Sequence, residues 1–191
     1  MTAPARRALP NAVRIIGGQW KRTRLPVADS PGLRPTPDRV RETLFNWLGQ
    51  DLTGWRCLDA FAGTGALGFE AASRGAARVV LLERDRRLAA GLEHLQQRLG
   101  ADALRVHTAD ALRWMAACEP ASFDLVFLDP PFDSALAAPA LERSARLLSA
   151  PGWVYLESGQ VFDTAGLATL GWRLQRSARA GQLHFGLLQR A

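Results

Sequence analysis

Four acidic residues stand at or just after the ends of short apolar segments: Asp59, Glu83, Asp110 and Asp129. If those segments are parallel strands, their carboxyl ends meet at one edge of a sheet, where ligands bind in such folds. A single acid there is unremarkable, since Asp commonly caps the following helix. Four acids on one edge, beside a glycine loop, are harder to explain as caps alone. The pattern therefore predicts a ligand site lined by carboxylates.

The glycine loop after the first segment reads Gly63-x-Gly65-x-x-Gly68, and Glu83 follows at the spacing of a dinucleotide fingerprint. A nicotinamide-dependent dehydrogenase therefore has to be considered. Asp59 argues against it, because a carboxylate at the start of the loop is unfavourable beside a pyrophosphate. The same carboxylate is favourable beside an ammonium or sulfonium group. The residues favour an adenosyl ligand with a cationic tail.

Residues of the loop and the rim have distinct roles toward such a ligand. Gly63 and Gly65 let the backbone approach it closely because they lack a side chain. Glu83 can accept both ribose hydroxyls, and Asp110 can accept the adenine amino group. The residues expected to bind the cofactor are Asp59, Phe61, Ala62, Gly63, Gly65, Glu83, Asp110 and Ala111.

The segments that must position these residues alternate between strand and helix patterns. Strands are expected over 55–60, 78–83, 104–108, 123–128 and 152–157, and helices over 66–73, 85–99, 111–118 and 134–148. Two last segments, 172–177 and 183–189, read as an antiparallel hairpin. Buried strands that alternate with helices predict an α/β fold whose mostly parallel sheet is covered on both faces.

The first 50 residues precede this alternation and differ from it in charge. The chain has 24 Lys and Arg against 18 Asp and Glu, and the whole excess of +6 lies in residues 1–50. We expect 1–50 to be a basic extension facing a polyanion and 51–191 to be a neutral body. Within the extension, 13–16 and 24–27 read as a hairpin. A helix follows, capped by Thr36, with Pro37 in its first turn and Gly49 at its end.

Composition excludes several classes of protein. No apolar run approaches the 18 residues of a membrane-spanning helix, and the N-terminal MTAPARRALP lacks the apolar stretch of a secretory signal. Two cysteines cannot form a disulfide scaffold, and three widely spaced histidines give no zinc pattern. We expect a cytoplasmic protein, a monomer by default, that uses no metal.

Two motifs together resemble a known class of enzymes. Asp59-x-Phe-x-Gly-x-Gly65 and Asp129-Pro-Pro-Phe132 resemble class I S-adenosylmethionine-dependent methyltransferases that act on an exocyclic or amide nitrogen. From about residue 13 to 190 the chain resembles the RsmD family of bacterial 16S ribosomal RNA guanine-N2 methyltransferases. The segments that carry this closer resemblance are Arg14-Ile-Ile-Gly-Gly18, Arg34-Pro-Thr-x-Asp-Arg-Val-Arg41 and LDAFAGTGALGFEAASRGA. Pro37 departs from the family, where Thr or Ser is expected, but Pro suits the first helical turn.

The resemblance implies both a fold and a reaction. The fold is a Rossmann-like sheet of seven strands in the order 3-2-1-4-5-7-6, with the last strand antiparallel. The reaction is methyl transfer from S-adenosylmethionine to N2 of guanine 966 in 16S ribosomal RNA, either naked or in a 30S assembly particle.

The chemistry of this reaction and the basic charge of residues 1–50 predict the substrate-facing residues. Asp129 and the carbonyl of Pro130 accept the N–H groups of guanine N2, Pro131 stiffens the turn, and Phe132 stacks on the base. The residues expected to face RNA are Arg14, Lys21, Arg22, Arg24, Arg34, Thr36, Arg39 and Arg41.

Two other functions stay open at this point. One is a methyltransferase for DNA adenine N6 or protein glutamine, although those relatives more often carry Asn-Pro-Pro-Tyr. The other is a nucleotide-binding or RNA-binding module without catalysis. Intact Asp59, Glu83 and Asp129 argue against the second.

Overall fold

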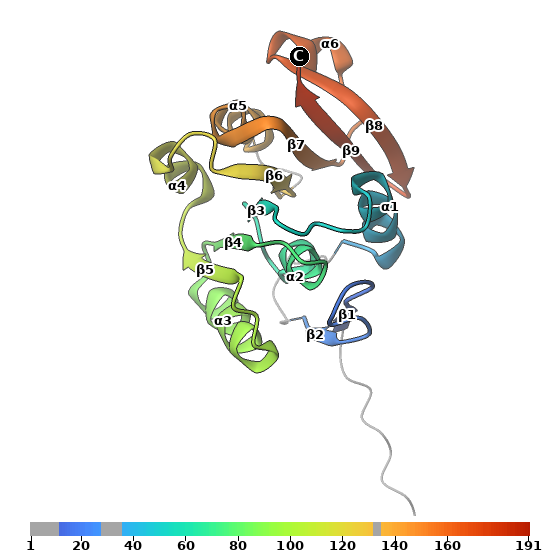
Figure 1. Cartoon of the computed structure of the whole chain (residues 1–191). Helices are drawn as coiled ribbons and strands as arrows, with labels where there is room; N and C mark the ends of the chain where they lie inside the picture. The colour runs from blue at the N-terminus through green and yellow to red at the C-terminus, as the bar shows by residue number, and fades with distance from the viewer. Residues whose placement is uncertain (1–11, 28–35, 132–134) are drawn as a thin grey trace, which may run out of the picture.

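The computed structural model describes residues 12–27, 36–131 and 135–191. One sheet contains β3 (Arg56–Asp59), β4 (Arg78–Glu83), β5 (Leu104–Thr108), β6 (Phe123–Leu128), β7 (Leu148–Ser158), β8 (Trp172–Ala180) and β9 (Leu183–Arg190). Its order is β5-β4-β3-β6-β7-β9-β8 (Figure 1). The pairs from β5 to β7 are parallel, and β9 is antiparallel to both β7 and β8. Numbered along the chain, this is the predicted order 3-2-1-4-5-7-6, so the predicted fold class is confirmed.

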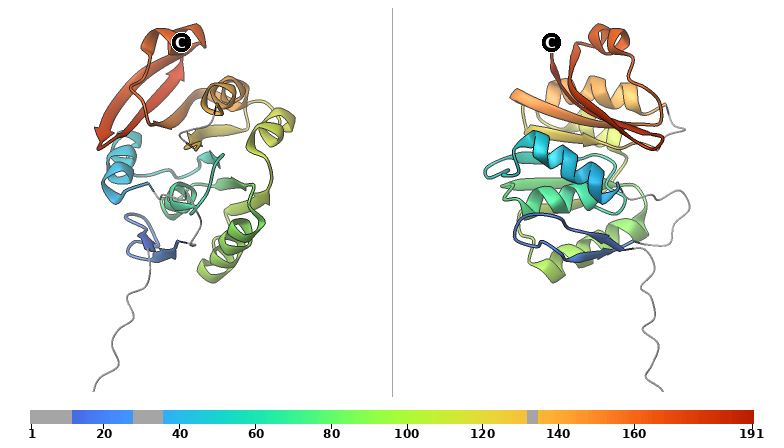
Figure 2. Two further views of the ribbon diagram at one scale, coloured as in Figure 1. Left: turned by 180° about the vertical axis from the view of Figure 1, so that it is seen from behind. Right: turned by 90° about the vertical axis from the view of Figure 1, so that its right-hand side faces the viewer.

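Helices cover both faces of this sheet, as the two views of Figure 2 show. The helices on one face are α1 (Asp38–Leu48), α2 (Ala66–Ser73) and α3 (Arg86–Leu99), and those on the other are α4 (Ala111–Ala117), α5 (Ala137–Leu147) and α6 (Thr164–Thr169). Within the described residues, no helix is long and apolar enough to cross a membrane.

The sequence of β4 illustrates why these strands are continuous runs of apolar residues and do not alternate between apolar and polar residues. Val79 and Leu81 pack in the cluster beneath α2 and α3, whereas Val80 and Leu82 pack in the cluster beneath α4. Successive side chains of a strand point to opposite faces, and both faces are buried here. The strand therefore has no solvent-facing side that would require polar residues.

The N-terminal hairpin packs onto the same side of the sheet as α2. It consists of β1 (Ala12–Arg14) and β2 (Arg24–Pro26), which pair antiparallel as predicted. Its residues Val13, Ile15 and Leu25 are buried in one apolar cluster with the sheet. The distinction between residues 1–50 and the rest therefore stays a prediction about function, since their packing is continuous.

Several local predictions are wrong. Pro37 is the N-cap residue of α1, and Thr36 does not cap it because its hydroxyl donates to Glu157. The short helix α6 was not predicted, and β7 begins at Leu148 rather than 152. The helix expected over 134–148 is α5, which begins at Ala137; residue 134 lies outside the described residues.

A buried carboxylate, Glu70 in α2, ties the hairpin and α1 to the sheet. Glu70 is 0% exposed and accepts hydrogen bonds from the backbone N–H groups of Ile16 (2.9 Å) and Gly17 (2.8 Å). It also accepts from Arg41 Nη1 (3.2 Å) and Arg74 Nε (2.9 Å). Two cations and two backbone donors compensate for burying one anion.

The prediction that Arg41 faces RNA is therefore corrected. Its side chain is 0% exposed, and its guanidinium donates to Glu70, Asp38 and the carbonyls of Thr36 and Arg14. A helix position off the apolar stripe was expected to face solvent, but the buried Glu70 draws Arg41 inward.

Candidate active site

A pocket of about 680 Å³ opens beyond the carboxyl ends of β3, β4, β5 and β6. It brings together most of the residues predicted from the sequence. Those that line it are Thr36, Asp59, Phe61, Ala62, Gly63, Glu83, Asp110, Ala111, Asp129, Pro130 and Pro131. Phe132 and Arg34 lie outside the described residues.

Asp59, at the end of β3, is 1% exposed and anchors the glycine loop. Its Oδ2 accepts a hydrogen bond from the Gly68 N–H at 3.0 Å. Burial raises the pKa of Asp59 to about 7; the Gly68 hydrogen bond opposes this shift, and the charges of Glu83 and Glu157 add to it. A cationic ligand tail in the pocket would favour the ionised form of Asp59. This agrees with the predicted place of Asp59 beside an ammonium or sulfonium group.

Glu83, at the end of β4, holds the loop from the other side. One oxygen accepts the Gly63 N–H (2.9 Å), and the other accepts the Asp85 N–H (2.8 Å). Each carboxylate oxygen can accept a further hydrogen bond, so Glu83 still has acceptor capacity toward the pocket.

Asp110 both caps a helix and lines the pocket, two roles that were weighed as alternatives for an acid at a strand end. Its Oδ1 accepts the Arg113 N–H at 2.9 Å, so it caps α4, and it also lines the pocket. One carboxylate oxygen serves the helix, which leaves the other available to a ligand.

Gly65 has a structural role in addition to the predicted one. It does not line the pocket, and its backbone has φ +74° at the N-cap of α2. A Cβ there would lie 2.7 Å from Leu92 Cδ2 and 2.8 Å from Phe69 Cδ2. Gly65 is therefore needed for a left-handed turn and for close packing, and its contact with the cofactor stays a prediction.

At the end of β6, Asp129 and Pro130 line the pocket together with Glu157 from β7. Glu157 is 3% exposed, and its Oε1 accepts hydrogen bonds from Thr36 Oγ1 and Tyr155 OH, both at 2.8 Å. Asp129 and Glu157 directly follow Leu128 and Leu156, which are paired residues of the adjacent strands β6 and β7, so the two carboxyl-bearing residues lie side by side. Part of Asp129 faces the open pocket, but its carboxyl group is densely surrounded by protein atoms. Burial, and then the charges of Glu157 and Asp59, raise its pKa well above the usual range.

Glu157 was not among the predicted site residues, although the signal for it was present. Glu157 ends an expected strand in the same way as the other four acids, and it is a fifth carboxylate on the rim. Thr36 lies close to it in space despite a separation of 121 residues in the chain.

The predicted RNA-facing residues fall into separate groups. Arg14, Lys21, Arg22, Arg24 and Arg39 are exposed, and Arg14 pairs with Asp38 at 3.1 Å. The loop that carries Lys21 and Arg22 is held by Ser73 at the far end of α2, away from the pocket. Thr36 lines the pocket but is 5% exposed.

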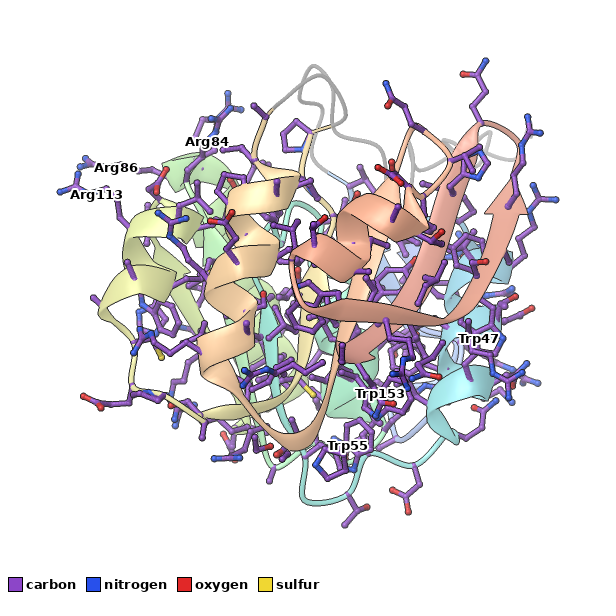
Figure 3. All side chains as sticks on the ribbon, turned by 90° about the horizontal axis from the view of Figure 1, so that it is seen from above. Trp47, Trp55, Arg84, Arg86, Arg113 and Trp153 are labelled. Atoms are coloured by element: carbon purple, nitrogen blue, oxygen red, sulfur yellow. The ribbon has the colours of Figure 1, made fainter. Side chains whose placement is uncertain are left out.

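Three exposed arginines that the sequence analysis did not single out lie beside the pocket. Arg84 lines the pocket, Arg86 begins α3, and Arg113 is in the first turn of α4. Figure 3 shows their side chains extending outward on one side of the molecule, far from Trp47, Trp55 and Trp153. All three follow the carboxyl ends of strands, so the fold brings them to the rim.

Comparison with known proteins identifies the family. The family model described as Conserved hypothetical protein 95 matches residues 13–189. The Ribosomal RNA small subunit methyltransferase D of Escherichia coli K12 is 45% identical over 93% of this chain and 90% of its own. The chain belongs to the RsmD family. The Haemophilus influenzae protein of the same name is 39% identical over 94% of this chain and 96% of its own.

Solved structures agree with this family assignment. The structure of the Escherichia coli protein yhhF matches with a TM-score of 0.81 and 39% identity, over 94% of this chain and 98% of that one. A SAM-dependent methyltransferase from Aquifex aeolicus matches with a TM-score of 0.61 over 81% of this chain and 93% of its own. At 16% identity, the second match shows a shared fold alone.

Among the described residues, no three His, Cys, Asp or Glu side chains are grouped so that they could hold a metal ion.

Proposed function

We propose that this RsmD-family chain methylates the exocyclic N2 of a guanine, guanine 966, in 16S ribosomal RNA. The observation that carries the proposal is the meeting of two sets of residues in one pocket. Asp129 and Pro130 supply acceptors for an amino group, while Asp59, Glu83 and Asp110 supply carboxylates for an adenosyl ligand. The names of the curated relatives support small-subunit ribosomal RNA as the substrate.

The residues present fit S-adenosylmethionine. The cavity volume lies within the range of small-molecule sites, and carboxylates from several strand ends converge on the cavity. Glu83 would accept the ribose hydroxyls, Asp110 the adenine amino group, and Asp59 would face the cationic tail. Bound there, the cofactor supplies an activated methyl group. No metal is part of the proposal.

The chain's own task is to prepare the amino nitrogen. The lone pair of guanine N2 is delocalised into the ring, which makes it a poor nucleophile. Acceptance of its N–H groups by Asp129 and the Pro130 carbonyl would localise that pair and aim it at the methyl group. Such positioning alone contributes roughly 7–11 kcal/mol in favourable cases. Pro131 limits the freedom of the turn, and Phe132 would stack on a base exposed or flipped from its helix.

Arginines around the pocket would hold the RNA backbone. The rim residues Arg84, Arg86 and Arg113 join the predicted Arg14, Arg24, Arg34 and Arg39 as candidates, with Lys21 and Arg22 farther away. Phosphate contacts of this kind fix orientation without reading sequence. The setting proposed is the cytoplasm, with a monomer acting on naked RNA or on a 30S assembly particle.

One assay tests the proposal against its rivals. Labelled S-adenosylmethionine is offered with 16S RNA, 30S particles, DNA and a glutamine-containing protein substrate. We expect label on N2 of one guanine of 16S RNA, and none with Asp129→Ala. Label on DNA or protein alone, or no label on RNA, would overturn the proposal.

A further inference from the structure

We propose that Asp129 and Glu157 share one proton and together accept the proton that the substrate amino nitrogen loses on methylation. The inference rests on the proposed function, and it assigns to Glu157 a role that acts through Asp129. Glu157 is thus a positioning residue, whereas Asp129 would touch the substrate.

The hydrogen bonds around Glu157 identify it as the anion of the pair. Thr36, which precedes α1, and Tyr155, which lies in the same strand as Glu157, both donate to its Oε1 at 2.8 Å. Asp129 and Glu157 follow the paired residues Leu128 and Leu156, so their carboxyl groups are neighbours at the pocket. An ionised carboxylate only accepts hydrogen bonds, so these two groups can bond to each other only when one of them carries a proton. Because Glu157 already has two donors, that proton belongs on Asp129.

The charges facing the pair favour a single negative charge. Asp59 faces it from the end of β3, with Glu83 of β4 next to Asp59. Arg41 of α1 acts on Tyr155 from the other side, but it is already bound to Glu70 and Asp38. Two adjacent carboxylates in such surroundings would repel each other, and one shared proton removes that repulsion.

The shared proton also orients Asp129. Its protonated oxygen faces Glu157, so the other oxygen is free to accept a substrate N–H in the pocket. Glu157 would therefore determine which oxygen atom of the Asp129 carboxyl group accepts the hydrogen bond from the substrate.

The same pair can complete the proton balance of the reaction. The amino nitrogen uses its lone pair to form the bond to the methyl group, as the methyl–sulfur bond of the donor breaks and leaves its electron pair on sulfur. One N–H bond then breaks, and its electron pair stays on nitrogen. The released proton moves to the free oxygen of Asp129, and the proton already on Asp129 passes to Glu157. The pair changes from one negative charge to none, and solvent is not needed during the step.

The first test uses the free protein and needs no substrate. Carboxyl-carbon NMR follows the titration of Asp129 and Glu157 in the full chain. Interacting carboxyls titrate in two macroscopic steps that both signals report. We expect two steps in the wild type and a single Asp129 step in Glu157→Gln. Independent single steps in the wild type would overturn the shared proton.

The second test measures single-turnover methylation against pH. We expect Glu157→Gln to slow the reaction roughly tenfold to a hundredfold, the lower end of general acid–base effects or below. RNA binding should stay within about twofold, since Glu157 does not touch the substrate. The matched control Glu142→Gln removes an exposed carboxylate of α5 and should leave the rate unchanged.

A double-mutant comparison separates a proton role from a structural one. Tyr155→Phe removes a donor that stabilises the Glu157 anion, so the acidic fall in rate should move to higher pH by roughly one unit. In a Glu157→Gln background, Tyr155→Phe should not change the pH at which the rate decreases on the acidic side. An equal shift in both backgrounds, or none in either, would overturn the proposal.

Failure of the proposed function looks different from failure of the pair. If the wild type methylates no guanine of 16S RNA, the proposed function and this proton step fail together. The two-step titration still decides whether Asp129 and Glu157 share a proton. If methylation occurs and Glu157→Gln reacts at the wild-type rate, only the inference fails.

Discussion

At the scale of single residues, the rim carboxylates serve the protein and its ligands at once. Asp59 holds the Gly68 N–H, Glu83 holds two loop N–H groups, and Asp110 caps α4. A carboxylate has about four acceptor positions, so each can stabilise its loop and still meet a ligand. Capping and ligand binding are therefore compatible here, although the sequence analysis treated them as alternatives.

The raised pKa of Asp59 predicts a specific pH dependence of stability. The folded protein holds this proton up to about pH 7, whereas the ordinary value is 3.8. Between these values the folded state binds more protons than the unfolded state, so stability falls as pH rises. Between these two pH values the free energy of unfolding decreases by on the order of 4 kcal/mol. In Asp59→Asn, whose amide oxygen can still accept the Gly68 N–H, urea unfolding should show a weaker fall from about pH 4 to 7. A fall as steep as in the wild type would show that Asp59 is not its cause.

At the scale of elements, the glycine loop and the hairpin are held in place by tightly packed contacts. Gly65 lets the loop turn into α2, and Glu70 joins α2 to the hairpin and α1. Both residues act on the geometry of the pocket without lining it.

Gly65→Ala should destabilise the protein by roughly 1–3 kcal/mol, because it combines a positive φ with a close approach to Leu92 and Phe69. Gly91→Ala is the matched control, since its Cβ would meet nothing within 4 Å. In the exposed part of α3 this change should stabilise by about 0.5–1 kcal/mol. Chemical denaturation compares the two variants, and equal effects would contradict the packing role of Gly65.

Glu70→Gln should cost about 3–5 kcal/mol, because it leaves the buried Arg74 without its counter-charge and leaves Arg41 with Asp38 alone. Glu93→Gln on the exposed face of α3 should change stability by less than about 0.5 kcal/mol. Urea midpoints at constant slope give both values. A loss near zero for Glu70→Gln would mean that the network contributes little to the fold.

At the scale of the whole molecule, the positions of the charged residues in space do not follow their order along the chain. The net charge of +6 comes from residues 1–50, yet one of their arginines is buried and two of their basic residues lie far from the pocket. Arg84, Arg86 and Arg113 of the formally neutral body lie at the rim instead (Figure 3).

Arg84 and Arg78 provide a matched pair, because they lie at opposite ends of β4 and both are exposed. If RNA binds over the pocket, Arg84→Gln should reduce the slope of log affinity against log salt by roughly one phosphate contact. Arg78→Gln should leave the slope as it is. Filter-binding titrations over a range of salt measure both slopes, and identical slopes would place the RNA elsewhere.

The strand order was implied by the family resemblance, whereas the order of the elements along the chain and most of the pocket could be predicted because the relevant signals are local. Apolar runs, glycine spacing and acids at strand ends are each read within a few residues, and a parallel sheet aligns those ends at one edge. The missed features depend on contacts between distant segments. Thr36 was expected to cap its own helix but donates to Glu157, 121 residues away.

The sequence by itself determined the edge at which Asp59, Glu83, Asp110 and Asp129 gather, and its resemblance to a family implied the seven-stranded order. Only the tertiary structure decided that Arg41 turns inward to Glu70, that Gly65 is needed for packing and that Glu157 joins Asp129. The physical reason is that periodicity reports which side of an element is apolar, whereas a buried polar group needs a particular partner. That partner can come from any part of the chain that the fold brings within hydrogen-bond distance.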